Sequence, residues 1–312
     1  MPEIVAVIGA TGFQGASVVK ALNALPDQYI VRGVTRSTTS ARVVELKAQY
    51  PKVEWVAADL KDPASLRAAF RGVDIVFGNT NYLQPEIFAQ VDAGDLDAEY
   101  RLGQNMVDAA IAEGVKHFVY SSLESPEKIG GPKYRGAHEP EGKHRIEQYI
   151  RSNKDKIAGY FVYAGFYFQN FLLSAQWDPS VGSGKEAVVF TYPLPADVPL
   201  PYLDIEEDLG ATVALALSDR SEYAGKVLAA VEGDYTPNEI TQSFTRNTGV
   251  PARYQYGVIP EIDRSDINTM LRFFIEFGAY TQLDATIAKT NASRPFTTLD
   301  QFWAKYASFR PE

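Results

Sequence analysis

The sequence VIGATGFQG, residues 7–15, is the strongest local indication of how this chain folds. It places Gly9, Gly12 and Gly15 between an apolar run and an amphipathic segment. Glycines at such spacing let a strand turn tightly into a helix and let the backbone approach a ligand. The free N–H groups of the helix N-terminus then favour a pyrophosphate. The spacing is GxxGxxG rather than GxGxxG, so the surrounding pattern decides between a dinucleotide site and a tight turn without a ligand.

Apolar runs alternate with helix-like segments over the first 165 residues. We expect strands at 3–9, 29–36, 53–60, 73–80, 116–122 and 157–165, and helices at 13–25, 40–50, 63–70, 97–114 and 142–150. Continuous apolar strands separated by amphipathic helices are typical of right-handed βαβ units and of a parallel sheet covered on both faces. The sequence therefore predicts an α/β fold with a doubly wound, parallel Rossmann sheet. In this setting the glycine stretch predicts dinucleotide binding.

The alternation weakens after residue 165, where Pro and Gly become frequent. A strand is expected at 186–192, and helices at 208–219, 236–249, 260–280 and 297–309. Thr236 or Asn238 caps the helix at 236–249, and Gly249 ends it. We therefore predict a Rossmann domain at 1–165 and a smaller mixed lobe at 166–312, partly interwoven with the sheet. Because ligands of open α/β sheets bind at the carboxyl edge of the strands, the lobe is expected to complete the pocket.

Composition narrows the class of protein. The 312 residues are 46 % hydrophobic and 22 % charged, with a formal net charge of −9 and no basic run, which argues against direct nucleic-acid binding. The absence of cysteine excludes disulfides and thiolate zinc sites. Three histidines, His117, His138 and His144, are too few and wrongly spaced for a metal site. Without a signal peptide or an apolar run of about 18 residues, we expect a cytoplasmic protein, with the nucleus as the alternative, and no membrane partner.

The end of the second strand bears on which dinucleotide binds. An NAD site favours an acidic residue there, whereas this chain has Arg36 followed by small hydroxyl residues. A cation amid hydroxyls suits a 2′-phosphate, so NADP(H) is predicted, with NAD as the alternative. The other interpretation is that Arg36 is simply exposed to solvent and binds no phosphate. Asp59, at the end of the third strand, either meets the adenine amino group or caps the helix that begins near Pro63.

A lysine interrupts the inward face of a later helix. Lys143, Ile146 and Ile150 fall at i, i+3 and i+7, the stripe that a helix turns toward its core. A buried ammonium is costly unless an anionic or polar group meets it. The position therefore predicts a bound or buried partner for Lys143.

Together these motifs resemble the NmrA-like family of atypical short-chain dehydrogenases/reductases, especially its fungal NmrA-type branch. The resemblance spans nearly the whole chain and rests on GATGFQG (9–15), VTR (34–36), NTNY (79–82), YSS (120–122), GKHRIEQYI (142–150), YAGFYFQNF (163–171) and VPLPYLDIEEDLG (198–210).

The resemblance implies a cofactor site for NADP(H) or NAD. Arg36 would lie at its adenosine end, and Thr80 and Asn81 along the cofactor. Lys143 would hydrogen-bond the nicotinamide ribose and, in the empty protein, face water. The residues implied at the pyrophosphate are Gly9, Thr11, Gly12, Phe13, Gln14 and Gly15, and the backbone from Tyr163 to Phe166 would flank the nicotinamide.

The resemblance also implies a proton-donating tyrosine four residues before the lysine, where this chain has Glu139. We expect Pro140 at the first helical position and Glu139 outside the helix, a poor acid unless burial raises its pKa. The residues that could replace the missing tyrosine as proton donor are Tyr134, Tyr120, Tyr82 and His138. Lys143 is then the candidate catalytic residue.

Two functions follow from this pattern. An intact cofactor site without the usual proton donor favours a dinucleotide-binding regulator or redox sensor that acts through a protein partner. The alternative is an NADPH-dependent reductase of a ketone, quinone, imine or enone. The aromatic-rich stretch 163–171 would then line a pocket for a flat small-molecule substrate, or else it is core.

Overall fold

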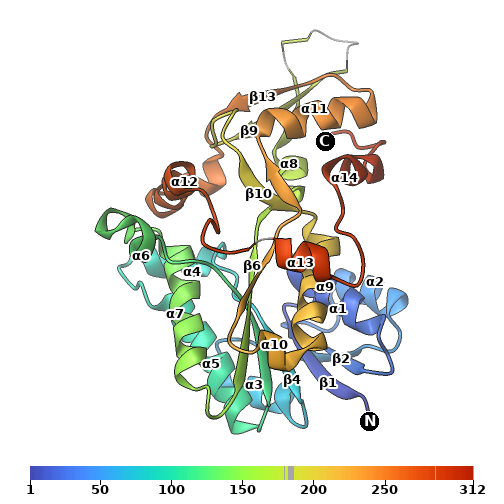
Figure 1. The fold of residues 1–312 in the computed structure, drawn as a ribbon, viewed down its shortest axis with the longest axis vertical. Coiled ribbons are helices and arrows are strands. Elements are labelled where there is room, and N and C mark those ends of the chain that lie inside the picture. The colour runs from blue at the N-terminus through green and yellow to red at the C-terminus, as the bar shows by residue number, and fades with distance from the viewer. Residues whose placement is uncertain (179, 182–185, 285, 312) are drawn as a thin grey trace.

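The computed structural model describes residues 1–178, 180, 181, 186–284 and 286–311. Its largest sheet has seven strands and lies in the lower half of Figure 1. The strand order is β11-β6-β5-β4-β1-β2-β3, and every neighbouring pair is parallel. The order reverses between β1 and β4, which creates the crevice where doubly wound sheets bind ligands. The predicted doubly wound parallel sheet is thus confirmed. Its strands are β1 (Glu3–Ile8), β2 (Tyr29–Thr35), β3 (Glu54–Ala57), β4 (Ile75–Gly78), β5 (His117–Ser122), β6 (Ala158–Ala164) and β11 (Val227–Ala230).

Helices cover both faces of this sheet, which explains why its strands are continuously apolar. Val5, Ala6 and Val7 of β1 have no exposed surface. One face packs on α1 (Phe13–Asn23) and α9 (Ile205–Ser218), the other on α3 (Pro63–Phe70), α5 (Ala98–Ala112) and α7 (His138–Ser152). Shorter helices flank these layers: α2 (Ala41–Gln49), α4 (Pro85–Asp92), α6 (Pro126–Gly130), η1 (Pro132–Tyr134), α10 (Arg220–Tyr223) and α13 (Thr286–Asn291).

Two helix starts differ from the sequence-based expectation. Helix α7 begins at His138, so Pro140 is the third helical residue and Glu139 is the second. Proline is tolerated there because N–H groups in the first turn have no intrahelical acceptor to lose. The expectation that Glu139 lies outside the helix is therefore wrong. Helix α3 is capped by Asp62, whose carboxylate accepts from Ala64 N at 3.0 Å, rather than by Asp59.

The chain returns to the large sheet after leaving it at β6. Strand β11 pairs with β6 as the seventh strand, and α9 packs against α1. Gly210 lets these helices approach closely, because a Cβ there would lie 2.1 Å from Ser17 O. The division at residue 165 stays a prediction, although elements from both halves share one core.

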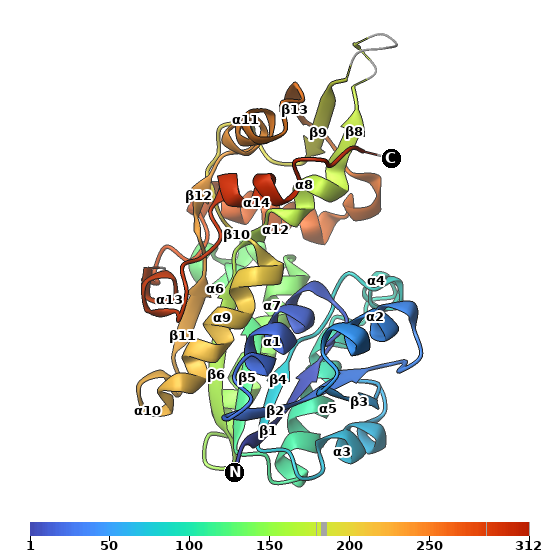
Figure 2. The same ribbon diagram turned by 90° about the vertical axis from the view of Figure 1, so that its right-hand side faces the viewer.

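The remaining elements form a smaller lobe beyond the carboxyl edge of the sheet (Figure 2). Two three-stranded sheets, β12-β10-β7 and β13-β9-β8, pack with helices around a third core cluster rich in aromatic residues. The strands are β7 (Phe166–Tyr167), β8 (Ala175–Trp177), β9 (Val188–Tyr192), β10 (Leu200–Leu203), β12 (Gly233–Tyr235) and β13 (Ala252–Tyr256). The helices are α8 (Gln169–Ser174), α11 (Pro237–Thr248), η2 (Pro260–Ile262), α12 (Ser265–Phe277) and α14 (Leu299–Lys305).

The predicted helix ends in the lobe agree only in part with the structure. Thr236 rather than Asn238 caps α11, in a capping box with Glu239, and Gly249 ends the helix with a φ of 71°. The helix expected at 260–280 is shorter, because η2 and an extended Arg264 precede α12. Within the described residues, no helix is long and apolar enough to cross a membrane.

Candidate cofactor site

The parallel sheet gathers most predicted site residues at one edge. Strands β1, β2, β3 and β4 all end there, so the segments that follow them lie along the same crevice. These segments carry the glycine loop, Arg36, Asp59 and Thr80. The lobe lies beyond the same edge (Figure 2). The predicted residues therefore share one face of the domain.

The glycine loop has two different steric requirements. Gly9 adopts a φ of +65°, which favours glycine. A Cβ on Gly15 would lie 2.2 Å from Gly9 O, so this glycine is needed for packing. A Cβ on Gly12 would meet only Gly9 O, at 3.5 Å, and Gly12 is exposed. Gly12 is also the N-cap of α1 and supplies no side-chain cap, so the first-turn N–H groups are open to an anion. This cradle fits a pyrophosphate.

The other loop side chains connect the loop to its surroundings. Gln14 Nε2 donates to the Tyr167 hydroxyl in β7 at 2.6 Å, and its Oε1 accepts from Asn79 Nδ2 at 3.2 Å. Phe13 is exposed and Thr11 is half-buried. The Gln14 amide therefore bridges the large sheet to the lobe.

The predicted adenosine end is open to solvent. Arg36 is exposed, and its guanidinium contacts Gln84 Oε1 at 3.4 Å. Asp59 is half-buried and uses Oδ1 to accept from Lys61 N at 2.8 Å. That bond closes a turn, which leaves the second carboxylate oxygen of Asp59 available to a ligand. Arg36 is therefore solvent-exposed at the carboxyl end of β2.

Thr80 and Asn81 follow β4 but have different environments. Thr80 is buried, and its hydroxyl donates to Glu99 Oε1 at 2.7 Å. Asn81 is exposed and caps a turn by accepting from Leu83 N at 3.1 Å. Thr80 therefore belongs to a buried polar cluster, whereas Asn81 lies on the exposed turn that follows it.

Lys143 meets a carboxylate rather than water. Its Nζ lies 2.6 Å from Glu99 Oε1, 2.9 Å from Thr80 O and 3.2 Å from Thr80 Oγ1. These three acceptors engage the three ammonium protons. The expectation that Lys143 faces water in the empty protein is therefore wrong, because helix α5 supplies an acid at the same depth.

Glu99 is not among the residues predicted from the sequence, although an acid on the buried face of a helix could have indicated it. Glu99, Leu102 and Met106 share the buried face of α5, so Glu99 interrupts an apolar stripe just as Lys143 does. The two helices pack closely: a Cβ on Gly142 would lie 2.6 Å from Glu99 Oε2, and one on Gly103 would lie 2.4 Å from Ile146 Cδ1. Two opposite charges, each on the buried face of its own helix, predict a buried ion pair.

Glu139 lies on the same helix as Lys143, four residues earlier, and no described residue hydrogen-bonds its carboxyl. Burial raises the pKa of Glu139 to about 7, helped by the charges of Glu99 and Asp266 and opposed by Lys143. The carboxyl therefore titrates near neutrality.

The alternative proton donors are committed elsewhere. The Tyr134 hydroxyl donates to Glu276 and the Tyr82 hydroxyl to Asp266. Tyr120 is fully buried beside Thr80, at 3.2 Å between their oxygens, and burial raises its pKa well above the usual value. Burial also lowers the pKa of His138, which leaves it neutral near pH 7.

The predicted nicotinamide end is aromatic. Tyr163 is buried and donates its hydroxyl to Glu147 Oε2 at 2.9 Å. Phe166 begins β7 and packs edge-on against Phe274, with ring centroids 5.4 Å apart. Gly165 between them approaches Pro201 O so closely that a Cβ would lie 2.7 Å away. The backbone from Tyr163 to Phe166 thus passes directly from the large sheet into the lobe.

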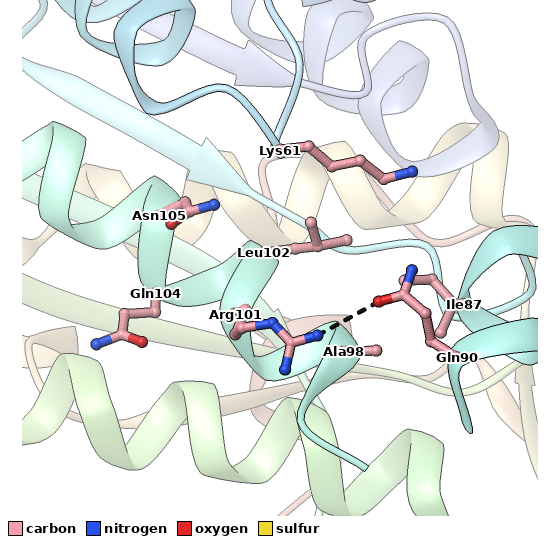
Figure 3. Close-up of a pocket in the computed structure, with 8 residues that line it drawn as sticks. All are labelled: Lys61, Ile87, Gln90, Ala98, Arg101, Leu102, Gln104 and Asn105. Atoms are coloured by element: carbon pink, nitrogen blue, oxygen red, sulfur yellow. Dashed lines mark hydrogen bonds between the residues drawn. The ribbon is translucent and has the colours of Figure 1, made fainter. Parts of the chain in front are cut away.

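A separate pocket of about 270 Å³ lies between α4, α5 and the segment after β3 (Figure 3). Arg101 and Gln90 contact each other at 3.3 Å beside it. None of the predicted site residues lines this pocket, so we do not assign it to the cofactor crevice. Its lining residues are Lys61, Ile87, Gln90, Ala98, Arg101, Leu102, Gln104 and Asn105.

Comparison with known proteins decides the family. A model of the NmrA-like family matches residues 1–303. The chain belongs to the NmrA-like family. An NmrA-like family domain-containing protein from Dictyostelium discoideum is 28 % identical over 313 residues, covering 98 % of each chain. The NmrA-like oxidoreductase hkm9 from Aspergillus hancockii is 32 % identical over 259 residues, which is 81 % of this chain and 75 % of that protein.

A solved NmrA-like structure shares the fold. The crystal structure of NmrA, a negative transcriptional regulator, in complex with NADP matches with a TM-score of 0.77 and 23 % identity, covering 98 % of this chain and 96 % of that one. The resemblance seen in the sequence is thereby confirmed. NmrA-like relatives include proteins named as regulators and proteins named as oxidoreductases.

Proposed function

We propose that this protein binds NADP(H) in the crevice between β1 and β4 and reduces a flat small molecule there. The observation that carries the cofactor assignment is the N-terminus of α1, which has no side-chain cap and begins at the exposed Gly12. Arg36, exposed at the end of β2, supplies the cation for a 2′-phosphate. The NADP of the related NmrA structure supports the same cofactor class.

When bound, the cofactor supplies a hydride at its nicotinamide ring. The chain's own residues bind and orient it: the α1 N–H groups hold the pyrophosphate, Arg36 the adenosine phosphate, and the backbone from Tyr163 to Phe166 the nicotinamide end. Lys143 would bind the nicotinamide ribose after exchanging one of its present acceptors. The aromatic side chains of the lobe exclude water and favour a flat ketone, quinone, imine or enone.

One observation supports the reductase over the regulator. The sequence favours the regulator because the position four residues before Lys143 holds Glu139, expected to be a poor acid outside the helix, instead of the usual tyrosine. Glu139 instead lies in the helix, with a pKa raised to about 7. A carboxylic acid of this kind suits proton transfer at neutral pH, because an effective acid or base has a pKa near the working pH. The reductase is therefore the first candidate.

A dinucleotide-dependent regulator is the second candidate, and one observation favours it. All three Lys143 donors are engaged by Glu99 and Thr80. A ribose that takes one of them must loosen a contact between α5, α7 and the end of β4. Cofactor binding would thereby be coupled to the packing of these elements, and a protein partner could detect the change.

A steady-state assay separates the two candidates. We expect NADPH oxidation with at least one member of a panel of ketones, quinones, imines and enones, and tighter binding of NADPH than of NADH by calorimetry. The matched control is the Gly12→Val variant, which should lose both signals. Tight NADPH binding without turnover of any compound would instead favour the regulator.

A further inference from the structure

The pocket between α4, α5 and the segment after β3 contains none of the residues predicted for the cofactor, and part of its lining is apolar. Ile87 of α4 and Ala98 and Leu102 of α5 line it, and all three are buried. Its volume of about 270 Å³ lies just below the usual range for ligand sites, about 300–1,000 Å³. The pocket therefore fits one small molecule with an apolar body.

The charged side chains that line this pocket are both cations. They are Lys61, from the segment after β3, and Arg101 of α5, and no aspartate or glutamate is found among the described residues of the lining. Figure 3 shows the two cations with Leu102 drawn between them. This lining contrasts with the chain as a whole, which has a net charge of −9. A pocket of this composition favours an anion.

The charge of Lys61 is uncompensated. Its side chain is exposed, and no carboxylate of the described part of the chain pairs with its ammonium. The backbone on which it lies is held in place by two hydrogen bonds. Lys61 N donates to Asp59 Oδ1 at 2.8 Å, and Asn105 Nδ2 of α5 donates to Leu60 O at 2.8 Å. A fixed segment thus presents a free cation at the pocket.

Arg101 is oriented by its neighbours and keeps donors in reserve. Its Nη1 donates to Asp95 Oδ1 at 2.8 Å, and its Nη2 donates to Asp95 Oδ2 and, at 3.3 Å, to Gln90 Oε1. These contacts use three of the five N–H donors of a guanidinium, so two are left for a ligand. Asp95 balances the charge of Arg101, which leaves the charge of Lys61 to be balanced by a ligand with one negative charge.

We propose that this pocket binds a small organic monoanion, a carboxylate on an apolar body, independently of the dinucleotide. The apolar body would pack on Ile87, Ala98 and Leu102. The carboxylate would accept from the Lys61 ammonium and from the free N–H groups of Arg101, which are charge-assisted hydrogen bonds. Because the residues predicted for the cofactor lie elsewhere, occupancy of the pocket requires neither NADP(H) nor turnover.

An NMR titration of the isotope-labelled full chain tests the proposal. Benzoate and cyclohexanecarboxylate are the probes, one flat and one puckered, and benzamide is the neutral counterpart of benzoate. We expect saturable binding of at least one acid, and benzoate should bind about tenfold more tightly than benzamide, because charged hydrogen bonds are lost in the amide. Saturating NADPH, which fills the cofactor crevice, should change the affinity for the acid by less than about twofold.

Variants of the two cations locate the bound acid. Lys61→Met and Arg101→Met should each weaken its binding by about tenfold and leave NADPH binding unchanged. Lys154→Met, at an exposed position after α7, is the control and should bind the acid as the parent does. Four results would overturn the proposal: no saturable binding of either acid, equal affinity for benzoate and benzamide, competition between the acid and NADPH, or parental affinity for the acid in both cation variants.

Discussion

Lys143 Nζ lies 2.6 Å from Glu99 Oε1, and both side chains are nearly inaccessible to solvent. Each residue interrupts the apolar stripe of its own helix, so α5 and α7 meet through an ion pair set in a hydrophobic interface. The second carboxylate oxygen of Glu99 has no hydrogen-bond partner within the described residues. The pair is therefore sensitive to the loss of either member, because the survivor would be a buried, uncompensated charge.

Replacing Lys143 should destabilise the empty protein. The helical stripe alone predicts that methionine would be tolerated at this position, but the structure reverses that expectation. Lys143→Met leaves the Glu99 carboxylate buried beside Thr80 without a cation, a change that typically costs about 3–5 kcal/mol. Urea unfolding of the cofactor-free protein measures the loss.

The double variant Lys143→Met, Glu99→Gln should be compared with Lys143→Met, because the double variant removes both charges. It should recover most of the lost stability. Lys154→Met, at an exposed position after α7, should change the free energy of unfolding by less than about 0.5 kcal/mol. A Lys143→Met protein as stable as the parent would show that the pair contributes nothing to folding.

The sequence predicts those parts of this site that depend on residues close together in the chain, but not those that depend on distant residues. The glycine loop and the parallel sheet follow from local patterns, because one strand–turn–helix unit carries both signals. The Lys143–Glu99 pair depends on the packing of two helices that brings together residues 44 positions apart in the chain. Each member can be recognised in the sequence as a charged residue on the apolar face of a helix, but the contact between the two residues cannot.

The helix start at His138 and the return of β11 to the large sheet were harder to foresee. Proline fits any position of a first helical turn, so Pro140 alone cannot locate the start. Strand β11 contains only Val227–Ala230, too short a run to distinguish a sheet strand from a buried loop. In both cases the deciding interactions are tertiary, so neither feature can be read from a local sequence pattern.

Gly12 and Gly15 should respond oppositely to substitution. Gly12→Val should abolish dinucleotide binding and leave the fold intact. Gly12 is exposed, and an added Cβ would only touch Gly9 O, at 3.5 Å, but the branched side chain would occupy the space expected for the pyrophosphate. Gly15→Ala should destabilise the cofactor-free protein, because its Cβ would lie 2.2 Å from Gly9 O. Calorimetric titration with NADPH and thermal unfolding of both variants provide the comparison. Unchanged NADPH affinity in Gly12→Val would mean that the loop is only a turn.

Arg36 should set the choice between NADPH and NADH. The parent protein is expected to bind NADPH at least several-fold more tightly, because the guanidinium is exposed at the end of β2 and contacts only Gln84 weakly. Arg36→Asp should erase or reverse the preference by presenting an acid to the ribose hydroxyls. Arg42→Asp, another exposed arginine of the same segment, serves as the control and should preserve the preference. Equal affinity of the parent for both cofactors would contradict this assignment.

Ionisation of Glu139 should make the protein less stable as the pH rises. The folded-state pKa, about 7, lies above the ordinary value of 4.5, so the folded state binds the proton more tightly than the unfolded state does. Stability from this group is therefore present below pH about 4.5 and is lost as the pH rises to about 7. The full shift corresponds to at most about 3 kcal/mol, and contact with solvent reduces it. Other carboxyl groups titrate over the same interval, so the measured quantity is the difference in free energy of unfolding between Glu139→Gln and the parent. It should be near zero at pH about 4.5 and favour the variant by about 1–3 kcal/mol at pH about 8, as determined by urea unfolding. The reverse dependence, or none, would indicate that Glu139 is ionised in the folded protein at neutral pH.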